Sequence, residues 1–107
     1  MPTFYKNAKV DLTSTDVTIL YTTPEAKTAV FRSILVADDS GSTSTITLTI
    51  TNSAAAVFVL YNVKATVANG TVELLTQPLV VLESEILKVT AANANRLHVV
   101  GSYIEIS

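Results

Sequence analysis

The amino-acid sequence predicts an all-β fold, an antiparallel β-sandwich of jelly-roll type with about eight short strands. Thr, Val, Ile, Leu and Ala dominate the chain, and β-branched residues fit the pleated, half-buried surface of a sheet. Clusters of Gly, Pro, Asn, Asp and Ser separate short apolar runs roughly every dozen residues, which is typical of strands and turns. The alanines at 54–56 run directly into a strand-like Val-Phe-Val-Leu-Tyr segment, so no helix is predicted.

The clearest strand is residues 45–51, where Ile46, Leu48 and Ile50 share one face and threonines occupy the other. The other predicted strands share its enrichment in β-branched and aromatic residues and are bounded by turn-forming residues. The eight predicted strands are residues 16–21, 27–37, 45–51, 56–63, 71–75, 79–82, 86–91 and 96–106. Residues 1–10 have no strong strand pattern, so we expect an N-terminal arm followed by a single sandwich domain over residues 11–107.

Turn-forming residues support these boundaries. Residues 38–42, Asp-Asp-Ser-Gly-Ser, predict a hairpin, because Asp forms local side-chain turns and Gly accepts a positive φ. Asn69 and Gly70 form the dipeptide preferred in two-residue hairpin loops, where both positions need a positive φ. Pro24 and Pro78 lack a backbone N–H, which places them at strand starts or in connections.

Two of the predicted strands are apolar on both faces. Residues 96–106 place on opposite faces the two sets Leu97, Val99, Tyr103 and Val100, Ile104, Ile106. Residues 27–37 do the same with the sets Phe31, Leu35 and Val30, Ile34, Val36. Such a strand is either covered by another layer or lies at a subunit interface. Because small cores are marginal on their own, we expect a homo-oligomer.

Composition excludes several classes of protein. The chain has 107 residues, 49% hydrophobic and 15% charged, which predicts one folded domain and excludes a disordered or low-complexity chain. The formal net charge is -2 and no basic stripe is present, so we expect no nucleic-acid partner. No apolar run approaches the ~18 residues of a spanning helix, and the N-terminus lacks a signal-peptide pattern, so we expect no membrane partner.

The sequence offers little for catalysis or cofactor binding. It has one histidine, His98, no cysteine and no G-x-S-x-G motif, which argues against a Ser-His-Asp triad and a zinc site. Asp38 and Asp39 lack the alternating ligands of a calcium loop. Glu83 and Glu85 have the spacing of a glycosidase-like pair on one strand face, but they lie in a predicted loop and are interpreted as a solvated edge. We therefore expect no enzymatic activity, cofactor, metal or small-molecule substrate.

Several stretches resemble small β-sandwich structural proteins of tailed bacteriophages. Residues 16–24 and 27–36, DVTILYTTP and KTAVFRSILV, are similar to the "tlYtvPaGktaivksi" opening of those proteins. Residues 79–91, LVVLESEILKVTA, are similar to their "pivL.aGD.lkv.as" stretch, and residues 98–106 to their closing strand. The resemblance covers residues 10–106.

Two departures from that pattern concern turns. Ala26 stands where the family has a glycine before the lysine, and Ser84-Glu85 stands where it has Gly-Asp. These turns must form without glycine, so their geometry is not carried over from the family.

The resemblance implies a non-enzymatic virion structural protein, foremost a capsid decoration or cement protein that binds and stabilises the assembled head. Its partners would be the major capsid protein or other virion proteins, and it would be made in the host bacterial cytoplasm. A neck, tail or fibre-adaptor component is the alternative, as is a receptor- or glycan-binding module, although no Trp is present for a sugar platform. A cupin-like hydrolase or isomerase would need a metal-ligand cluster that one histidine does not supply.

The resemblance also directs attention to interface residues instead of catalytic ones. Phe4 and Tyr5 lie on the expected arm, which could order on docking by adding a strand to a partner. Tyr103, Ile104 and Ile106 lie on the doubly apolar last strand. Ordinary core packing is the alternative for both groups.

Overall fold

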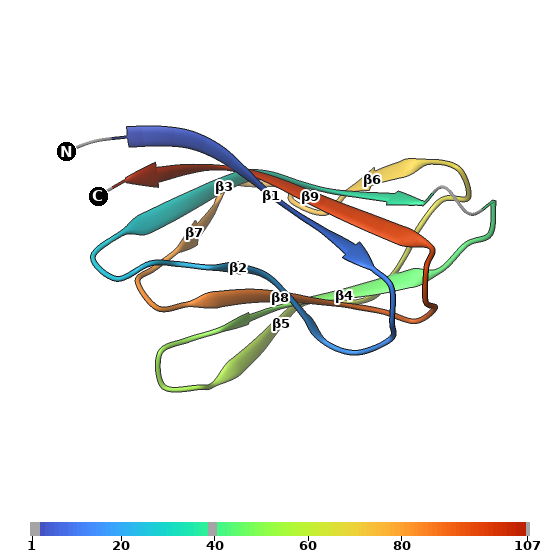
Figure 1. Cartoon of the computed structure of the whole chain (residues 1–107), viewed down its shortest axis with the longest axis horizontal. Coiled ribbons are helices and arrows are strands. Elements are labelled where there is room, and N and C mark those ends of the chain that lie inside the picture. Colours follow the sequence, from blue (N-terminus) through green and yellow to red (C-terminus); the bar gives the residue numbers. More distant parts are fainter. Residues whose placement is uncertain (1–2, 39–40, 107) are drawn as a thin grey trace.

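The computed structural model describes residues 3–38 and 41–106, which form two antiparallel sheets packed face to face (Figure 1). In the first sheet, β1 (Thr3–Leu12) pairs with β9 (Leu97–Ile106), and β9 pairs with β3 (Thr28–Asp38). The far edge of β3 is shared by β6 (Thr71–Glu73) and β7 (Leu79–Val81). The second sheet has the order β2 (Thr18–Thr22), β8 (Ile86–Ala91), β4 (Thr45–Thr51), β5 (Val57–Ala65). The predicted all-β sandwich is confirmed.

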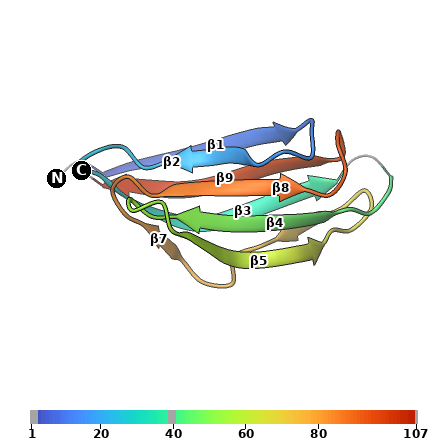
Figure 2. The same cartoon turned by 90° about the horizontal axis from the view of Figure 1, so that it is seen from below.

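The strand order is that of a jelly roll. The antiparallel pairs are nested along the chain: β4 with β5 innermost, then β3 with β6 and β7, then β2 with β8, and β1 with β9 outermost. This long four-level hairpin is rolled up so that β9 also pairs with β3 and β8 also pairs with β4. Figure 2 shows β2, β8, β4 and β5 side by side, with the first sheet behind them. As a result, β9, β3, β8 and β4 are each paired on both sides. The edges of the first sheet are β1 on one side and β6 with β7 on the other, and the edges of the second sheet are β2 and β5.

All eight predicted strands are present, with ends displaced by at most a few residues, but the structure adds a ninth. Residues 1–10 were expected to form an arm, whereas Thr3–Leu12 is a strand paired with β9 along its whole length. The register turns Lys6 to the same side as Tyr103, toward the core, where its ammonium group meets Glu105. A lysine at an inward position breaks the apolar alternation, which is why the strand is invisible to periodicity.

The predicted faces of the two doubly apolar strands are correct for β9 and wrong for β3. In β9 the predicted faces are correct, with Leu97, Val99 and Tyr103 buried and Val100 exposed. In β3 the prediction of faces is wrong, because the pairing with β9 shifts register between Phe31 and Ser33. This β-bulge inserts one extra residue, so that Phe31 and the later apolar residues Ile34 and Val36 are all buried in one core, and Leu35 is exposed.

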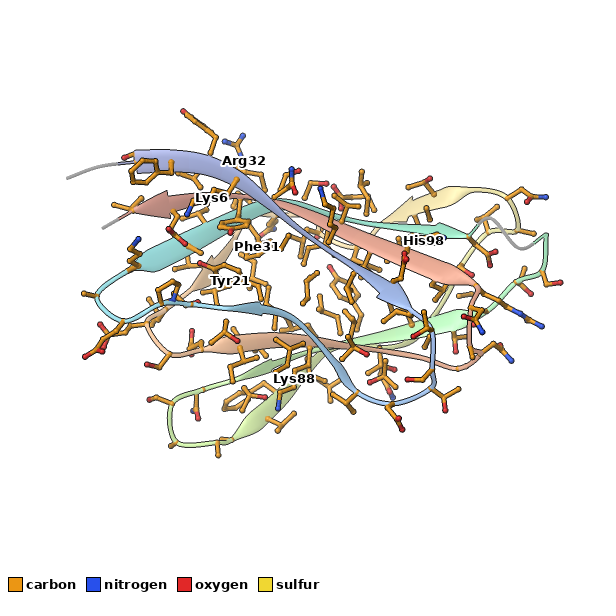
Figure 3. All side chains as sticks on the ribbon, viewed as in Figure 1. Lys6, Tyr21, Phe31, Arg32, Lys88 and His98 are labelled. Atoms are coloured by element: carbon orange, nitrogen blue, oxygen red, sulfur yellow. The ribbon has the colours of Figure 1, made fainter. Side chains whose placement is uncertain are left out.

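The centre of the core is an aromatic cluster that explains a glycine. The ring of Phe31 stacks on Tyr103 at 4.7 Å between centroids and meets Tyr21 edge to face at 5.2 Å. Tyr21 and Phe31 lie between the two sheets in Figure 3. A Cβ atom on Gly101 would lie 2.7 Å from Cε2 of Phe31, closer than real contacts allow. Gly101 is therefore required for the Phe31 ring to cover β9.

The turn at Asn69 and Gly70 is not the two-residue hairpin that the sequence predicts. Asn69 has a φ of 54° and the N–H of Gly70 donates to the Val67 carbonyl, but Gly70 itself does not have a positive φ. This turn connects β5 in one sheet to β6 in the other, so the predicted two-residue hairpin is wrong. Pro24 and Pro78 lie outside the strands, as predicted. The hairpin predicted at residues 38–42 falls partly outside the described residues.

Candidate functional site: the outer face of the first sheet

The outer face of the first sheet carries an apolar row across four strands. Cross-strand pairing places Tyr5 of β1 beside Ile104 of β9, Ile104 beside Val30 of β3, and Val30 beside Val80 of β7. Tyr5 is 83% exposed and Val80 is 51% exposed, while Ile104 and Val30 are half-buried. We call these four residues the apolar row. It lies near the end of the sandwich where the start of β1 meets the end of β9 (Figure 1).

The five residues predicted for an interface do not all lie on this face. Tyr5, Ile104 and Ile106 share the outer face. Tyr103 is only 8% exposed, and its ring packs in the aromatic cluster, so this side chain is part of the core. Phe4 is 47% exposed and is paired with the inward-facing Glu105, on the other side of β1 from Tyr5. The structure thus brings three of the five together on one surface.

A shallow concavity of about 360 Å³ opens beside the apolar row. Its lining residues are Tyr5, Lys6, Asn7, Arg32, Ser102, Tyr103 and Ile104. Asn7, Arg32 and Ser102 are exposed and give the concavity amide, guanidinium and hydroxyl groups next to an aromatic ring. Sequence periodicity missed these three residues, because their position depends on the bulge in β3 and on the strand β1. The signal that the sequence offered was Arg32, a charged residue between the apolar segments 29–31 and 34–36 of β3.

Beneath this face, Glu105 is the centre of a buried polar cluster. Only 2% of Glu105 is exposed, and its Oε1 accepts hydrogen bonds from Lys6 Nζ at 3.0 Å and Lys27 Nζ at 3.3 Å. Its Oε2 accepts a hydrogen bond from the Tyr21 hydroxyl at 2.9 Å. These donors, led by Lys6, hold the pKa of Glu105 below its usual range despite its burial. Burial, together with the hydrogen bond to Glu105, raises the pKa of Tyr21 well above its usual range.

The Glu105 cluster is built for cohesion, not for chemistry. Its four side chains come from β1, β2, β9 and the residue preceding β3, so the cluster ties both sheets together. Its carboxylate is held in the charged form, with all three donors directed at it, and no concavity described above opens onto its oxygens. A general acid or base works best when its pKa lies near the operating pH, and the pKa of Glu105 is shifted in the opposite direction, further below neutrality.

His98 lies at the other end of the outer face. Its Nδ1 contacts a carboxylate oxygen of Asp11, the residue opposite it on β1. Its cross-strand neighbour on β3 is Ala37, so the two flanking strands place no hydroxyl nucleophile opposite the imidazole. Within residues 3–38 and 41–106, no cluster of three or more His, Cys, Asp or Glu side chains could hold a metal ion. This histidine-aspartate pair is a surface contact between β1 and β9.

Glu83 and Glu85 brace turns. The Glu83 carboxylate accepts the N–H of Ala26 at 2.7 Å, and the Glu85 carboxylate accepts the N–H of Leu82 at 2.7 Å. The backbone of Glu85 also accepts the N–H of Thr23 at 3.0 Å. The Glu83 carboxylate and the Glu85 backbone carbonyl therefore join the turn after β2 to the turn after β7, while the Glu85 carboxylate closes its own turn.

Comparisons with known proteins add no relative. No protein-family model, curated protein or solved structure matches the chain. The part of the chain that the structure describes contains no helix long and apolar enough to cross a membrane. The resemblance to phage structural proteins stays a prediction from the sequence.

Proposed function

We propose that this chain is a non-enzymatic structural protein of a tailed-bacteriophage particle, foremost a capsid decoration protein that docks through the outer face of its first sheet. The observation that carries the proposal is the apolar row, in which Tyr5 and Val80 are more than half exposed. Aromatic and aliphatic side chains aligned across a sheet face mark a surface that another protein covers. The resemblance of residues 10–106 to phage structural proteins and the jelly-roll topology agree with this role.

The mechanism would be addition of contact area. A small protein bound at many equivalent positions links neighbouring shell subunits, and each repeated contact lowers the free energy of the assembled shell. The partners would be the major capsid protein or another virion protein, with copies of this chain arranged around symmetry axes. A neck, tail or fibre-adaptor position would use the same surface at a lower copy number.

Add-back to particles tests this proposal. Particles from a phage deleted for this chain are mixed with the purified protein, and bound protein and resistance of the particles to heat are measured. We expect saturable binding and increased heat resistance. Tyr5→Ala is expected to weaken binding about tenfold, as loss of an interface aromatic typically does.

Ile19→Ala is the matched control, because Ile19 is 54% exposed on the outer face of the second sheet. Its binding should equal that of the unmodified protein. Absence of binding by the unmodified protein would overturn the proposed function, and equal losses for both variants would overturn the choice of face.

A further inference from the structure

The bulge in β3 places an arginine on the docking face. Phe31 pairs with Tyr103 and Ser33 pairs with Ser102, so Arg32 is the extra residue between two regular pairs. In a regular strand that buries Phe31, Ile34 would face outward. The bulge keeps both apolar residues in the core and leaves Arg32 exposed on the outer face (Figure 3). Bulges commonly redirect a side chain at a functional surface.

The guanidinium of Arg32 is not neutralised within the described part of the chain. Two carboxylates of the first sheet are engaged elsewhere: Glu105 on its inner face with Lys6 and Lys27, and Asp11 at the far end of its outer face with His98. Glu73, on the same face, accepts the backbone N–H groups of Ile34 and Leu75. No ion pair joins Arg32 to any acidic residue that the structure describes. This exposed cation therefore remains available to an external anion.

The surroundings of Arg32 indicate what kind of anion fits. Arg32 shares its concavity with the exposed ring of Tyr5, the Asn7 amide and the Ser102 hydroxyl. A guanidinium offers a planar fork of donors that matches a carboxylate in bidentate geometry. The apolar row adjoins this concavity and spans three interstrand spacings, about 14 Å, which exceeds a single sugar ring and suits an extended peptide segment.

We propose that Arg32, with Tyr5 beside it, binds an Asp or Glu side chain carried by an apolar segment of the shell protein on which this chain docks. This inference rests on the proposed docking function and names the chemistry of the partner. The acidic side chain enters the concavity while its apolar neighbours cover the apolar row. Arg and Tyr are the residue types that most often dominate binding at protein interfaces.

Binding of variants to the deletion particles tests the role of Arg32. Arg32→Gln is expected to weaken binding about 30-fold or more, because it leaves the partner's carboxylate unpaired in the interface. Arg32→Lys keeps the charge but loses the planar fork and should recover only part of the affinity. Raising the salt concentration should weaken the unmodified protein more than Arg32→Gln. Circular dichroism and melting temperature should not change, because Arg32 is exposed.

Lys88→Gln is the matched control, since it removes one positive charge from the outer face of the second sheet, opposite Arg32 (Figure 3). Its binding should equal that of the unmodified protein. If the unmodified protein and Arg32→Gln bind particles equally, the carboxylate site is overturned and the docking function stands. If the unmodified protein does not bind, both are overturned.

A separate titration distinguishes an acidic sugar from an acidic protein segment. Glucuronate is added to the isotope-labelled protein, and the amide resonances of Tyr5 and Ser102 are followed by NMR. Weak shifts that do not saturate are expected. Saturable shifts that disappear in Arg32→Gln, together with unchanged particle binding of that variant, would overturn the protein-carboxylate assignment in favour of an acidic glycan.

Discussion

Glu105 shows how a single buried charge can fix the end of a sandwich. Its oxygens receive hydrogen bonds from Lys6, Lys27 and Tyr21, which belong to three different parts of the chain. A buried carboxylate is costly unless such donors compensate for its lost hydration. The pairing also explains why Lys6 faces inward on β1, at a position where an apolar residue would otherwise be expected.

The lowered pKa of Glu105 makes stability depend on pH. Because the folded-state pKa lies below the ordinary value of 4.5, the unfolded chain binds the proton more readily. The stabilisation from Glu105 is therefore present above about pH 4.5 and is lost as the pH falls through the folded-state pKa. We expect Glu105→Gln to lower the free energy of unfolding by about 1–2 kcal/mol at pH 7, because charged hydrogen bonds from two partly exposed lysines are lost.

Thermal unfolding between pH 2 and pH 7 measures this effect, in steps of roughly one unit across the acid range. The unmodified protein should lose melting temperature in acid more steeply than Glu105→Gln. Glu85→Gln is a control, because Glu85 is a half-buried turn residue whose carboxylate accepts the N–H of Leu82, a hydrogen bond that the glutamine oxygen can also accept. Identical acid profiles for the unmodified protein and Glu105→Gln would contradict the role assigned to the cluster.

Two turns store backbone strain, at Ala26 and at Ser84. Ala26 has a φ of 62° and Ser84 a φ of 64°, both in the left-handed region that costs non-glycine residues about 1 kcal/mol. We expect Ala26→Gly and Ser84→Gly each to raise the free energy of unfolding by about 0.5 kcal/mol, after the added flexibility of the unfolded chain is subtracted.

Denaturant unfolding measures the change. Ala8→Gly is the control, since Ala8 lies in the middle of β1, and glycine there should destabilise by about 0.5–1 kcal/mol. Destabilisation by both turn substitutions would show that the left-handed geometry is not strained.

At the scale of elements, the sequence predicts strands well and their faces less well. Alternation and turn residues locate eight strands, because each has a period of two or a continuous apolar run. β1 escapes because Lys6 points inward, and its inward position makes sense only once its hydrogen bond to Glu105 of β9 is known. The faces of β3 are mispredicted because a bulge at Arg32 depends on pairing with β9, which no local pattern encodes. The outer face of the first sheet depends on both features, so the sequence alone could identify only Tyr5, Ile104 and Ile106 on it.

β1 is an integral part of the sheet, and its removal should show this. Deletion of residues 1–12 exposes the edge of β9 along ten paired positions and leaves Glu105 without Lys6. We expect loss of cooperative unfolding or a melting temperature lower by at least about 15 °C, with aggregation through the exposed edge. Circular dichroism and light scattering during heating measure both.

The double variant Tyr5→Ala, Asn7→Ala is the control for that deletion. It removes two outward side chains but keeps every backbone hydrogen bond of β1, so its melting temperature should stay within a few degrees of the unmodified protein. A deletion variant as stable as the full chain would mean that residues 1–12 form a dispensable arm.

At the scale of the molecule, the jelly roll separates two tasks between two sides of one sheet. The inner face of the first sheet carries the aromatic cluster and the Glu105 cluster, which stabilise the fold. The outer face carries the apolar row and Arg32, with Tyr5, Val80 and Arg32 exposed. Strand order could not be predicted from periodicity, since nested pairing joins residues almost a whole chain apart. The surface that supports the proposed function follows from that pairing.

The copy number of this chain in purified particles, relative to the major shell protein, decides whether it is a decoration protein. Quantitative mass spectrometry of intact particles measures it. A decoration protein predicts a ratio near parity or a simple fraction of it, because docking sites repeat with the symmetry of the shell. A ratio small enough for a single ring would place the chain at the neck, tail or fibre base instead of over the head. Its complete absence from particles would contradict the virion function.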